Sequence, residues 1–216
     1  MKKSFKNWTR QELKKVFGVT QVDATAALDD WISIENITVS SEEVAFLERL
    51  LQKSLRYMDS WNETELREKF IIKILELVDF EFEERGCHTF AERYLSVTVE
   101  NTVLYGFVDW FVATGYQFPE QPFFFIHEYK PEGAKELDGR GQLLATMLAT
   151  SALNKGDFPI YGTFVQGRLW FFLTYHNLEF AETSSYDILK IDDLLQVVKI
   201  LKKQKAIILQ RLSIAF

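Results

Sequence analysis

Two acidic residues and one lysine stand at positions where their spacing could support chemistry. Glu128 and Lys130 end an apolar segment, residues 123–130, which is predicted to be a central strand because it is apolar on both faces. Side chains two positions apart in a strand project from the same face, so these two charges are expected to lie together. Because burying an unpaired charge is expensive, a buried strand that ends in charged residues requires partners for them.

Asp109 lies in a second β-rich segment, residues 103–113, and supplies a further carboxylate. If this segment pairs with residues 123–130 and Asp109 lies level with Glu128, both acids meet Lys130 at one edge of the sheet. Neighbouring carboxylates repel one another, and a divalent cation relieves the repulsion. A small number of hard oxygen ligands suits Mg²⁺ or Mn²⁺, which keep bound waters and accept phosphate oxygens from a substrate. A lysine beside such an ion would orient an attacking water or stabilise charge on the phosphate.

Each of these residues also has a simpler explanation. Asp109 could accept hydrogen bonds at a turn, and Glu128 and Lys130 could form an exposed ion pair, which contributes little to stability. The Glu-x-Lys triplet is weak by itself, because Glu12-Leu-Lys14 matches it inside a predicted helix. The order of the elements that carry these residues, rather than any single residue, favours a site.

A helix predicted over residues 62–79 adds another carboxylate. Asn62 is a favourable N-cap residue, and Glu65 three positions later completes a capping-box pattern. At about 100° per residue, Glu63 falls near the centre of the apolar stripe of this helix. A first-turn acid also complements the helix dipole at the protein surface, so both interpretations of Glu63 stay open.

The remaining pattern predicts helices before and strands after this segment. Residues 10–58 are expected to be helices and their connections, and further elements are predicted as strands at 94–100, 160–165, 169–175 and 178–183 and as helices at 138–154 and 190–212. This order indicates an α/β (mixed α+β) protein, with a central mixed sheet flanked by helices. Residues 1–60 are expected to form an N-terminal helical extension packed on a core of residues 61–216, which ends in the C-terminal helix.

Four segments in this order resemble a known group of enzymes. Gly106-Phe-Val-Asp109, followed nineteen residues later by Glu128-Tyr-Lys130, is similar to the core motif of the PD-(D/E)XK nuclease superfamily. The helix Asn62–Ile71 resembles the one that opens that fold, as in the nuclease region of type I restriction subunits. Gly141-Gln142-Leu-Leu-Ala145 resembles the helix that places a glutamine near the site in several such families. The whole string is also similar to a group of bacterial proteins, often from Bacteroidetes, and the resemblance spans about residues 60–185.

The resemblance implies a restriction-endonuclease-like fold and a role for each matching residue. Asp109 and Glu128 would be metal ligands, the backbone carbonyl of Tyr129 would add a third, and Lys130 would assist the attacking water. The cofactor would be Mg²⁺ (or Mn²⁺). Val108 departs from the pattern, because many of these motifs carry a proline before the acid.

Two further residues take supporting roles in that comparison. Glu63 would lie in the outer coordination sphere of the metal, and Gln142 would support the site or touch the phosphate backbone. Arg168 is expected at a hairpin turn near Tyr161-Gly162, where it could meet phosphate or simply be solvated. His127 should face away from Glu128, which favours a packed histidine over a catalytic one.

The reading that follows is a metal-dependent phosphodiester hydrolase, above all a DNA nuclease, with nucleic acid as its partner. The alternative is an inactive nuclease-like fold that serves as a binding or assembly module. A third hypothesis is a nuclease subunit that needs a partner for contact with DNA. The sequence also leaves a homodimer open. The formal net charge of −6 favours the alternative, because nucleic-acid binders usually carry a basic surface. Only residues 1–15 are clearly basic, with six Lys/Arg and one acid.

Composition limits the setting. The sole cysteine, Cys87, is expected in a polar loop and allows no intrachain disulfide, which fits a reducing compartment. No apolar run approaches the roughly 20 residues of a membrane helix, and no apolar leader follows the N-terminal Met-Lys-Lys. A cytoplasmic protein without membrane partners is therefore expected.

Overall fold

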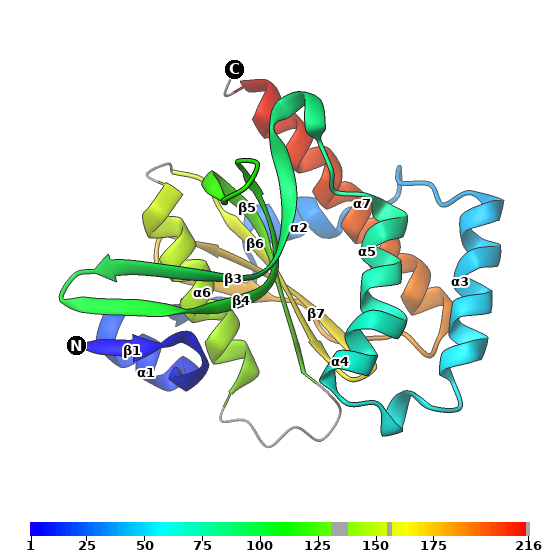
Figure 1. The fold of residues 1–216 in the computed structure, drawn as a ribbon, viewed down its shortest axis with the longest axis horizontal. Coiled ribbons are helices and arrows are strands. Elements are labelled where there is room, and N and C mark those ends of the chain that lie inside the picture. The colour runs from blue at the N-terminus through cyan, green and yellow to red at the C-terminus, as the bar shows by residue number, and fades with distance from the viewer. Residues whose placement is uncertain (131–137, 155–156, 215–216) are drawn as a thin grey trace.

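The computed structural model describes residues 1–130, 138–154 and 157–214, and it places the strands in one sheet with helices on both faces (Figure 1). The strands are β1 (Lys2–Ser4), β2 (Thr20–Gln21), β3 (Cys87–Val99), β4 (Thr102–Thr114), β5 (Glu120–Lys130), β6 (Ile160–Gln166), β7 (Leu169–His176), β8 (Glu179–Glu182) and β9 (Tyr186–Asp187). The helices are α1 (Arg10–Phe17), α2 (Ala26–Ile32), α3 (Ser41–Ser54), α4 (Glu63–Leu66), α5 (Ile72–Val78), α6 (Gly139–Asn154) and α7 (Ile191–Ile214). Four short helical turns complete the described elements: η1 (Phe5–Asn7), η2 (Met58–Ser60), η3 (Arg67–Ile71) and η4 (Glu83–Arg85).

The sheet mixes parallel and antiparallel pairing. Its order is β1-β4-β5-β6-β7-β8-β2, with β3 on β4 and β9 on β7. The pairs β1–β4, β5–β6 and β2–β8 are parallel, whereas the other pairs are antiparallel. The predicted α/β class, a central mixed sheet flanked by helices, is confirmed, and it is consistent with a restriction-endonuclease-like fold.

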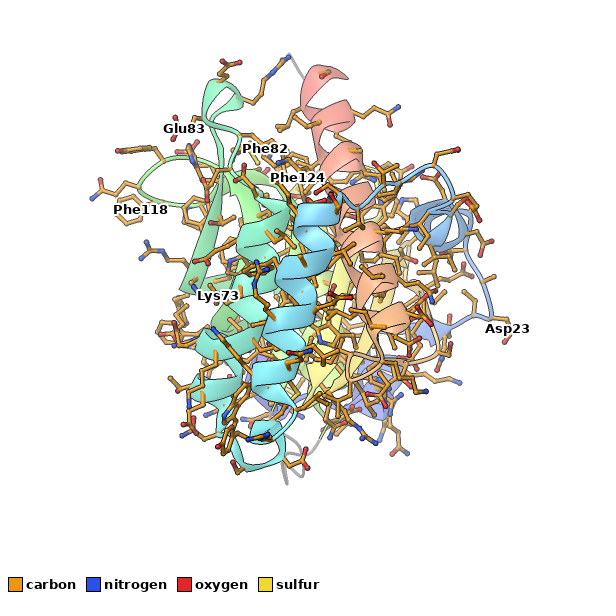
Figure 2. All side chains as sticks on the ribbon, turned by 90° about the vertical axis from the view of Figure 1, so that its right-hand side faces the viewer. Asp23, Lys73, Phe82, Glu83, Phe118 and Phe124 are labelled. Carbon is orange, nitrogen blue, oxygen red and sulfur yellow. The ribbon has the colours of Figure 1, made fainter. Side chains whose placement is uncertain are left out.

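Two apolar cores lie on opposite faces of the sheet. One holds residues of α2, α3, α4, α5 and α7, and Figure 2 shows α3 and α5 covering this side of the molecule with α7 beside them. The other holds residues of η1, α1 and α6, with Leu143, Leu144 and Met147 fully enclosed. Because both faces are covered, β5 is apolar on both faces up to Ile126, as its sequence predicts.

The helical segment over residues 63–78 contains a local irregularity that the periodicity does not predict. Asn62 caps it as expected: its side chain accepts a hydrogen bond from Glu65 N at 2.9 Å, and Glu65 Oε2 accepts one from Asn62 N at 3.2 Å. Between α4 and α5, however, residues Arg67–Ile71 form a turn of π-helix. Such a turn inserts an extra residue into the helical repeat, so residues before and after it no longer share one stripe.

The first 21 residues supply two strands that the sequence pattern does not predict. β1 pairs with β4, Lys2 opposite Val103, and β2 pairs with β8. These strands are too short to show a period of two. The predicted boundary between residues 1–60 and 61–216 stays a prediction, although the N-terminal residues share both cores with the rest of the chain.

The expectation that Cys87 lies in a polar loop is wrong. β3 begins at Cys87, seven residues before the predicted strand at Tyr94, and the thiol is fully enclosed, opposite Thr114. Burial raises the pKa of Cys87 to about 12. Within the described parts of the chain, no helix is long and apolar enough to cross a membrane.

Candidate functional site

Asp109 and Glu128 lie opposite one another on neighbouring strands. The antiparallel register of β4 and β5 pairs Phe111 with Ile126 and ends with Trp110 opposite His127, so Asp109 and Glu128 directly follow the last pair, and their side chains are hydrogen-bonded. Cross-strand partners have Cβ atoms about 4.5–5.5 Å apart, which brings the two carboxyl groups into contact range. The predicted convergence of these acids at the end of β5 is therefore present in the fold.

Lys130 adds its ammonium to the two acids. Its Nζ lies 2.9 Å from Glu128 Oε1 and 3.7 Å from Glu63 Oε1. The side chains of Lys130 and Glu128 are 7% and 1% exposed, whereas that of Glu63 is 42% exposed. Glu63, in the first turn of α4, thus faces the cluster at its solvent edge. Its side chain points toward the charged residues, as the apolar stripe predicts, and is also partly exposed, as a first-turn surface acid would be.

The electrostatics of the cluster follow from burial and mutual repulsion. Burial and the charge of Asp109, to which Glu128 is also hydrogen-bonded, raise the pKa of Glu128 well above its usual range. Burial also opposes the charged form of Lys130, but the charges of Glu128 and Asp109 outweigh it and raise the lysine pKa. These shifts favour a charged Lys130 beside a Glu128 carboxyl that holds its proton more firmly than an exposed glutamic acid does.

Tyr129 ties the cluster to the helix on the other face of β5. Its backbone N–H donates to Asp109 Oδ2 at 3.3 Å, which holds the carboxylate against the strand end. Its hydroxyl accepts a hydrogen bond of 3.0 Å from Arg67 Nη1, and Arg67 also pairs with Glu92. Sequence reasoning missed Arg67, because its position depends on the π-turn that begins there.

A fork in the sheet opens a pocket beside these residues. Along one edge, β4 pairs with β1 at residues 103–105 and with β5 at residues 110–114, and between these stretches no strand of the described chain pairs with that edge. A pocket of about 520 Å³ lies there, and Asp109, Lys130 and Gln142 line it. Pockets that bind small ligands have similar volumes, about 300–1,000 Å³.

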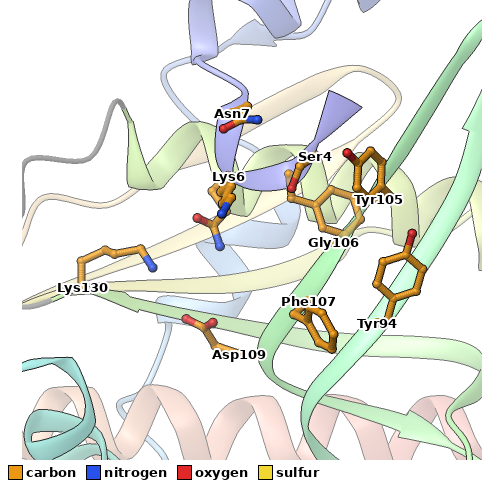
Figure 3. A pocket seen from close by; sticks show the side chains of 11 residues that line it. Ser4, Lys6, Asn7, Tyr94, Tyr105, Gly106, Phe107, Asp109 and Lys130 are labelled. Atoms are coloured by element: carbon orange, nitrogen blue, oxygen red, sulfur yellow. The ribbon is translucent and has the colours of Figure 1, made fainter. Parts of the chain in front are cut away.

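Part of the pocket lining comes from residues to which the sequence pattern assigns no role. Lys6 and Asn7 of η1 line it together with Tyr94 of β3 and Tyr105 and Phe107 of β4. Figure 3 shows the aromatic rings on one side of the pocket, with Lys130, Asp109 and Lys6 on the other. The cluster of six Lys/Arg in residues 1–15 was the available signal for Lys6.

Close packing at the start of α6 positions Gln142 and the N-terminal wall. A Cβ on Gly141 would lie 2.3 Å from the carbonyl oxygen of Trp8, so only glycine lets α6 approach the N-terminal segment this closely. Asp138, just before α6, accepts hydrogen bonds from Arg10 N at 3.0 Å and Arg10 Nε at 3.1 Å. These contacts bring Gln142, which is 6% exposed, into the same pocket as Asp109 and Lys130.

Arg168 does lie at the predicted hairpin turn, between β6 and β7, but it does not line this pocket. The neighbouring Gly167 N–H donates to Lys130 O at 2.8 Å, so the turn is close to the end of β5. The guanidinium points instead to Asp187, with Nε 3.8 Å from Oδ2. A supporting role for Arg168 therefore stays a prediction.

His127 faces the opposite side of β5, as its sequence position predicts. It is fully enclosed against the rings of Trp110, Tyr129 and Trp170, with ring centroids 5.4–6.3 Å away. Burial lowers its pKa to about 3, so the imidazole is neutral at physiological pH. Neither ring nitrogen has a hydrogen-bond partner among the described residues, which argues for packing rather than proton transfer.

The cluster offers a cation fewer oxygen ligands than a site in which the protein supplies every ligand. Among the described residues, no group of three or more His, Cys, Asp or Glu side chains has a metal-binding arrangement. Asp109 and Glu128 remain as an adjacent pair of hard donors, and Tyr129 contributes the carbonyl between Glu128 and Lys130. Mg²⁺ is often held by only one or two carboxylates together with waters and substrate phosphate, so this donor set fits it.

No protein-family model and no curated protein sequence matches the chain. Solved structures do match, and one of them is the cryo-electron microscopy structure of the DrdV–DNA complex, with 16% sequence identity and a TM-score of 0.41. The match covers 76% of this chain but only 14% of that chain. A likeness of this degree establishes neither the fold nor the function of this protein.

Proposed function

We propose that this protein is a metal-dependent phosphodiester hydrolase that acts on DNA. The observation that carries the proposal is the meeting of two carboxylates, Asp109 and Glu128, with the ammonium of Lys130, where Asp109 and Lys130 line an open pocket. The resemblance of these residues to the motif of the PD-(D/E)XK nucleases supports the same activity. The buried position of Glu128 supports it further. A buried acid beside another acid is costly in free energy, and acids with strongly shifted pKa values cluster at functional sites.

Asp109 and Glu128 would hold Mg²⁺ or Mn²⁺, with the carbonyl of Tyr129 as a further oxygen donor. Bound there, the ion would polarise a phosphate oxygen and lower the pKa of a water molecule. The hydrogen bond from Tyr129 N–H to Asp109 Oδ2 fixes the orientation of that carboxylate in advance. Such preorganisation reduces the cost of assembling the site during the reaction.

Lys130 has the chemistry to act on the phosphate or on the attacking water. Its raised pKa keeps the ammonium charged, so it would stabilise the negative charge that develops on the phosphate rather than remove a proton itself. Glu63, partly exposed at 3.7 Å from Nζ, limits the positions that this ammonium adopts. Gln142 lines the same pocket and has an amide to offer to a phosphate or a water.

One observation favours the second candidate, an inactive nuclease-like module. Lys130 already pairs with Glu128 at 2.9 Å, so the carboxylate has a charged partner without any metal. The net charge of −6 also opposes non-specific attraction to DNA. In that case the pocket would bind a partner without hydrolysing it.

The test is Mg²⁺- or Mn²⁺-dependent cleavage of single- and double-stranded DNA by the wild type and by Asp109→Asn and Glu128→Gln. Removing one metal-binding carboxylate is expected to reduce the rate by at least about 100-fold, as loss of a key electrostatic group does in other enzymes. Glu120→Gln is the matched control, because Glu120 lies at the other end of the same strand and is exposed. Cleavage that persists in both site variants, or none by the wild type, would overturn the proposed activity.

A further inference from the structure

Three aromatic side chains gather beside the carboxylates, outside both cores. Tyr94 of β3 lies opposite Phe107 of β4 in the antiparallel register, and Tyr105 lies two positions before Phe107. Side chains at alternate positions of a strand share a face, so Tyr105 and Phe107 project from the same side of β4, and Asp109 follows two positions further along the strand. All four of these residues line the same pocket (Figure 3).

Two of the three rings are exposed. Tyr94 and Phe107 are 50% and 63% exposed and contact one another, so they form a contiguous patch rather than isolated apolar side chains. Their centroids lie 5.6 Å apart with the planes at 69°, and Tyr94 and Tyr105 lie 6.3 Å apart at 44°. Because the Tyr94–Phe107 contact is edge to face, these two rings do not stack on each other, and a third flat group can stack on one of them.

Positive charge accompanies the rings in an otherwise acidic protein. The pocket lining includes two lysines, Lys6 and Lys130, against one acid, Asp109. Lys6 is exposed and forms no ion pair within the described parts of the chain, while Lys2 Nζ sits 4.9 Å from the ring centroid of Tyr105. An occupant of this pocket thus meets flat apolar faces on one side and ammonium groups on the other.

We propose that the rings and Lys6 bind unpaired nucleotides of single-stranded DNA, with a base stacked on Phe107 or Tyr94 and a phosphate at Lys6. The inference rests on the proposed function only in assigning this strand as the substrate that is led to Asp109. A base in a duplex is covered on both faces by its neighbours, so exposed aromatic rings select a strand whose bases are free. Lys6, which forms no ion pair within the described parts of the chain, supplies the attraction to the backbone that such grooves require.

The experiment measures binding in EDTA, so that it does not depend on cleavage. Fluorescence anisotropy would compare oligodeoxythymidylate of about 12 nucleotides, within the site sizes of single-strand grooves, with a blunt duplex of mixed sequence and the same length. The wild type is expected to bind the single strand more tightly. Phe107→Ala and Tyr94→Ala should each weaken single-strand binding about tenfold, which is within the range for loss of one stacked base.

A matched control separates stacking from the loss of any exposed ring. Tyr116→Ala and Phe118→Ala remove rings that are 90% and 69% exposed on the connection between β4 and β5, away from the pocket, and should leave binding unchanged (Figure 2 labels Phe118). Lys6→Ala should weaken single-strand and duplex binding alike and make both less dependent on salt, because a phosphate contact does not distinguish a single strand from a duplex.

The outcomes distinguish this inference from the proposed hydrolysis. Equal binding of single strand and duplex, no binding of either, or equal loss in the Phe107 and Tyr116 variants would overturn the inference, whatever the cleavage assay shows. Single-strand binding that depends on Phe107 and Tyr94 supports it even if no cleavage is found. In that case the hydrolase proposal fails and the binding surface stands.

Discussion

Lys130 and Glu128 form an ion pair that the protein almost completely withdraws from water. Nζ lies 2.9 Å from Oε1, and the two side chains are 7% and 1% exposed. Lys73 and Glu76 on α5 are separated by the same 2.9 Å, but their side chains are 45% and 61% exposed. The two pairs differ in burial rather than in distance, so they allow the effect of burial to be measured.

Lys130→Met is expected to lower the free energy of unfolding by about 3 kcal/mol at pH 8, because it leaves the buried Glu128, with the partly buried Asp109 beside it, without the ammonium of Lys130. Lys73→Met should cost less than about 0.5 kcal/mol, since exposed pairs are screened by water. Urea denaturation followed by circular dichroism measures both variants.

The destabilisation caused by Lys130→Met should depend on pH. The folded-state pKa of Glu128 is already raised, and loss of Lys130 raises it further. A group with a raised folded-state pKa contributes stability below its unfolded-state pKa and loses that contribution as the pH rises. The cost of Lys130→Met should therefore be larger at pH 8 than at pH 5, and equal small costs at both pH values would contradict the buried arrangement.

Mn²⁺ should bind the wild type with a single saturable isotherm in calorimetric titration and should not bind Asp109→Asn/Glu128→Gln. Because the pKa of Glu128 is raised, binding of the cation competes with a proton, so its affinity should increase as the pH rises, by at most about tenfold per pH unit. Glu120→Gln serves as the control with the same change at an exposed position of β5. Unchanged binding in the double variant would place the cation elsewhere.

Gly141→Ala is expected to displace the N-terminal wall of the pocket. The new methyl group would lie 2.3 Å from Trp8 O and 2.8 Å from Thr9 Cα, and backbone atoms cannot yield as the end of a side chain can. The free energy of unfolding should fall by about 2 kcal/mol, typical of overpacking, and amide exchange in residues 5–9 should accelerate. Ala152→Ser, at an exposed position of the same helix, should change neither, and a variant with wild-type exchange in residues 5–9 would refute the close contact.

His127→Phe should flatten the pH dependence of stability. The folded-state pKa of about 3 lies below the ordinary value of 6.5, so the unfolded chain takes up a proton that the folded one does not as the pH falls below 6.5. Between pH 7 and pH 5 this histidine alone should cost the wild type about 2 kcal/mol. Since neither nitrogen has a hydrogen-bond partner among the described residues, the phenylalanine loses no such bond, and equal pH slopes in the two proteins would contradict the burial.

The meeting of the charged residues was predictable because it depends on alternation and strand adjacency. Glu128 and Lys130 share a face whenever residues 123–130 form a strand, and Asp109 joins them if the preceding strand pairs in this register. Glu63 was predictable only in part: the capped helix start places it in the first turn, but the sequence left the direction of its side chain open. These are short-range rules, and each was visible in the types and spacing of a few residues.

The pocket itself was not predictable, because it is created by pairing between distant segments. Three residues, Lys2–Ser4, carry no period of two, and only the fold places them beside β4. The aromatic wall was hidden for a different reason: Tyr94, Tyr105 and Phe107 read as strand residues whose exposure depends on what covers them. The turn of π-helix at Arg67–Ile71 likewise leaves no clear mark in a single sequence.

The fork in the sheet has a consequence for the behaviour of the protein in concentrated solution. Along one edge of β4, only β1 covers the backbone groups of residues 103–105. Without β1, this strand edge would be a template for pairing with another chain. β1 has only three residues, so we expect it to detach from β4 early in local unfolding. The N-terminal residues that border the pocket therefore also protect the protein from self-association through β4.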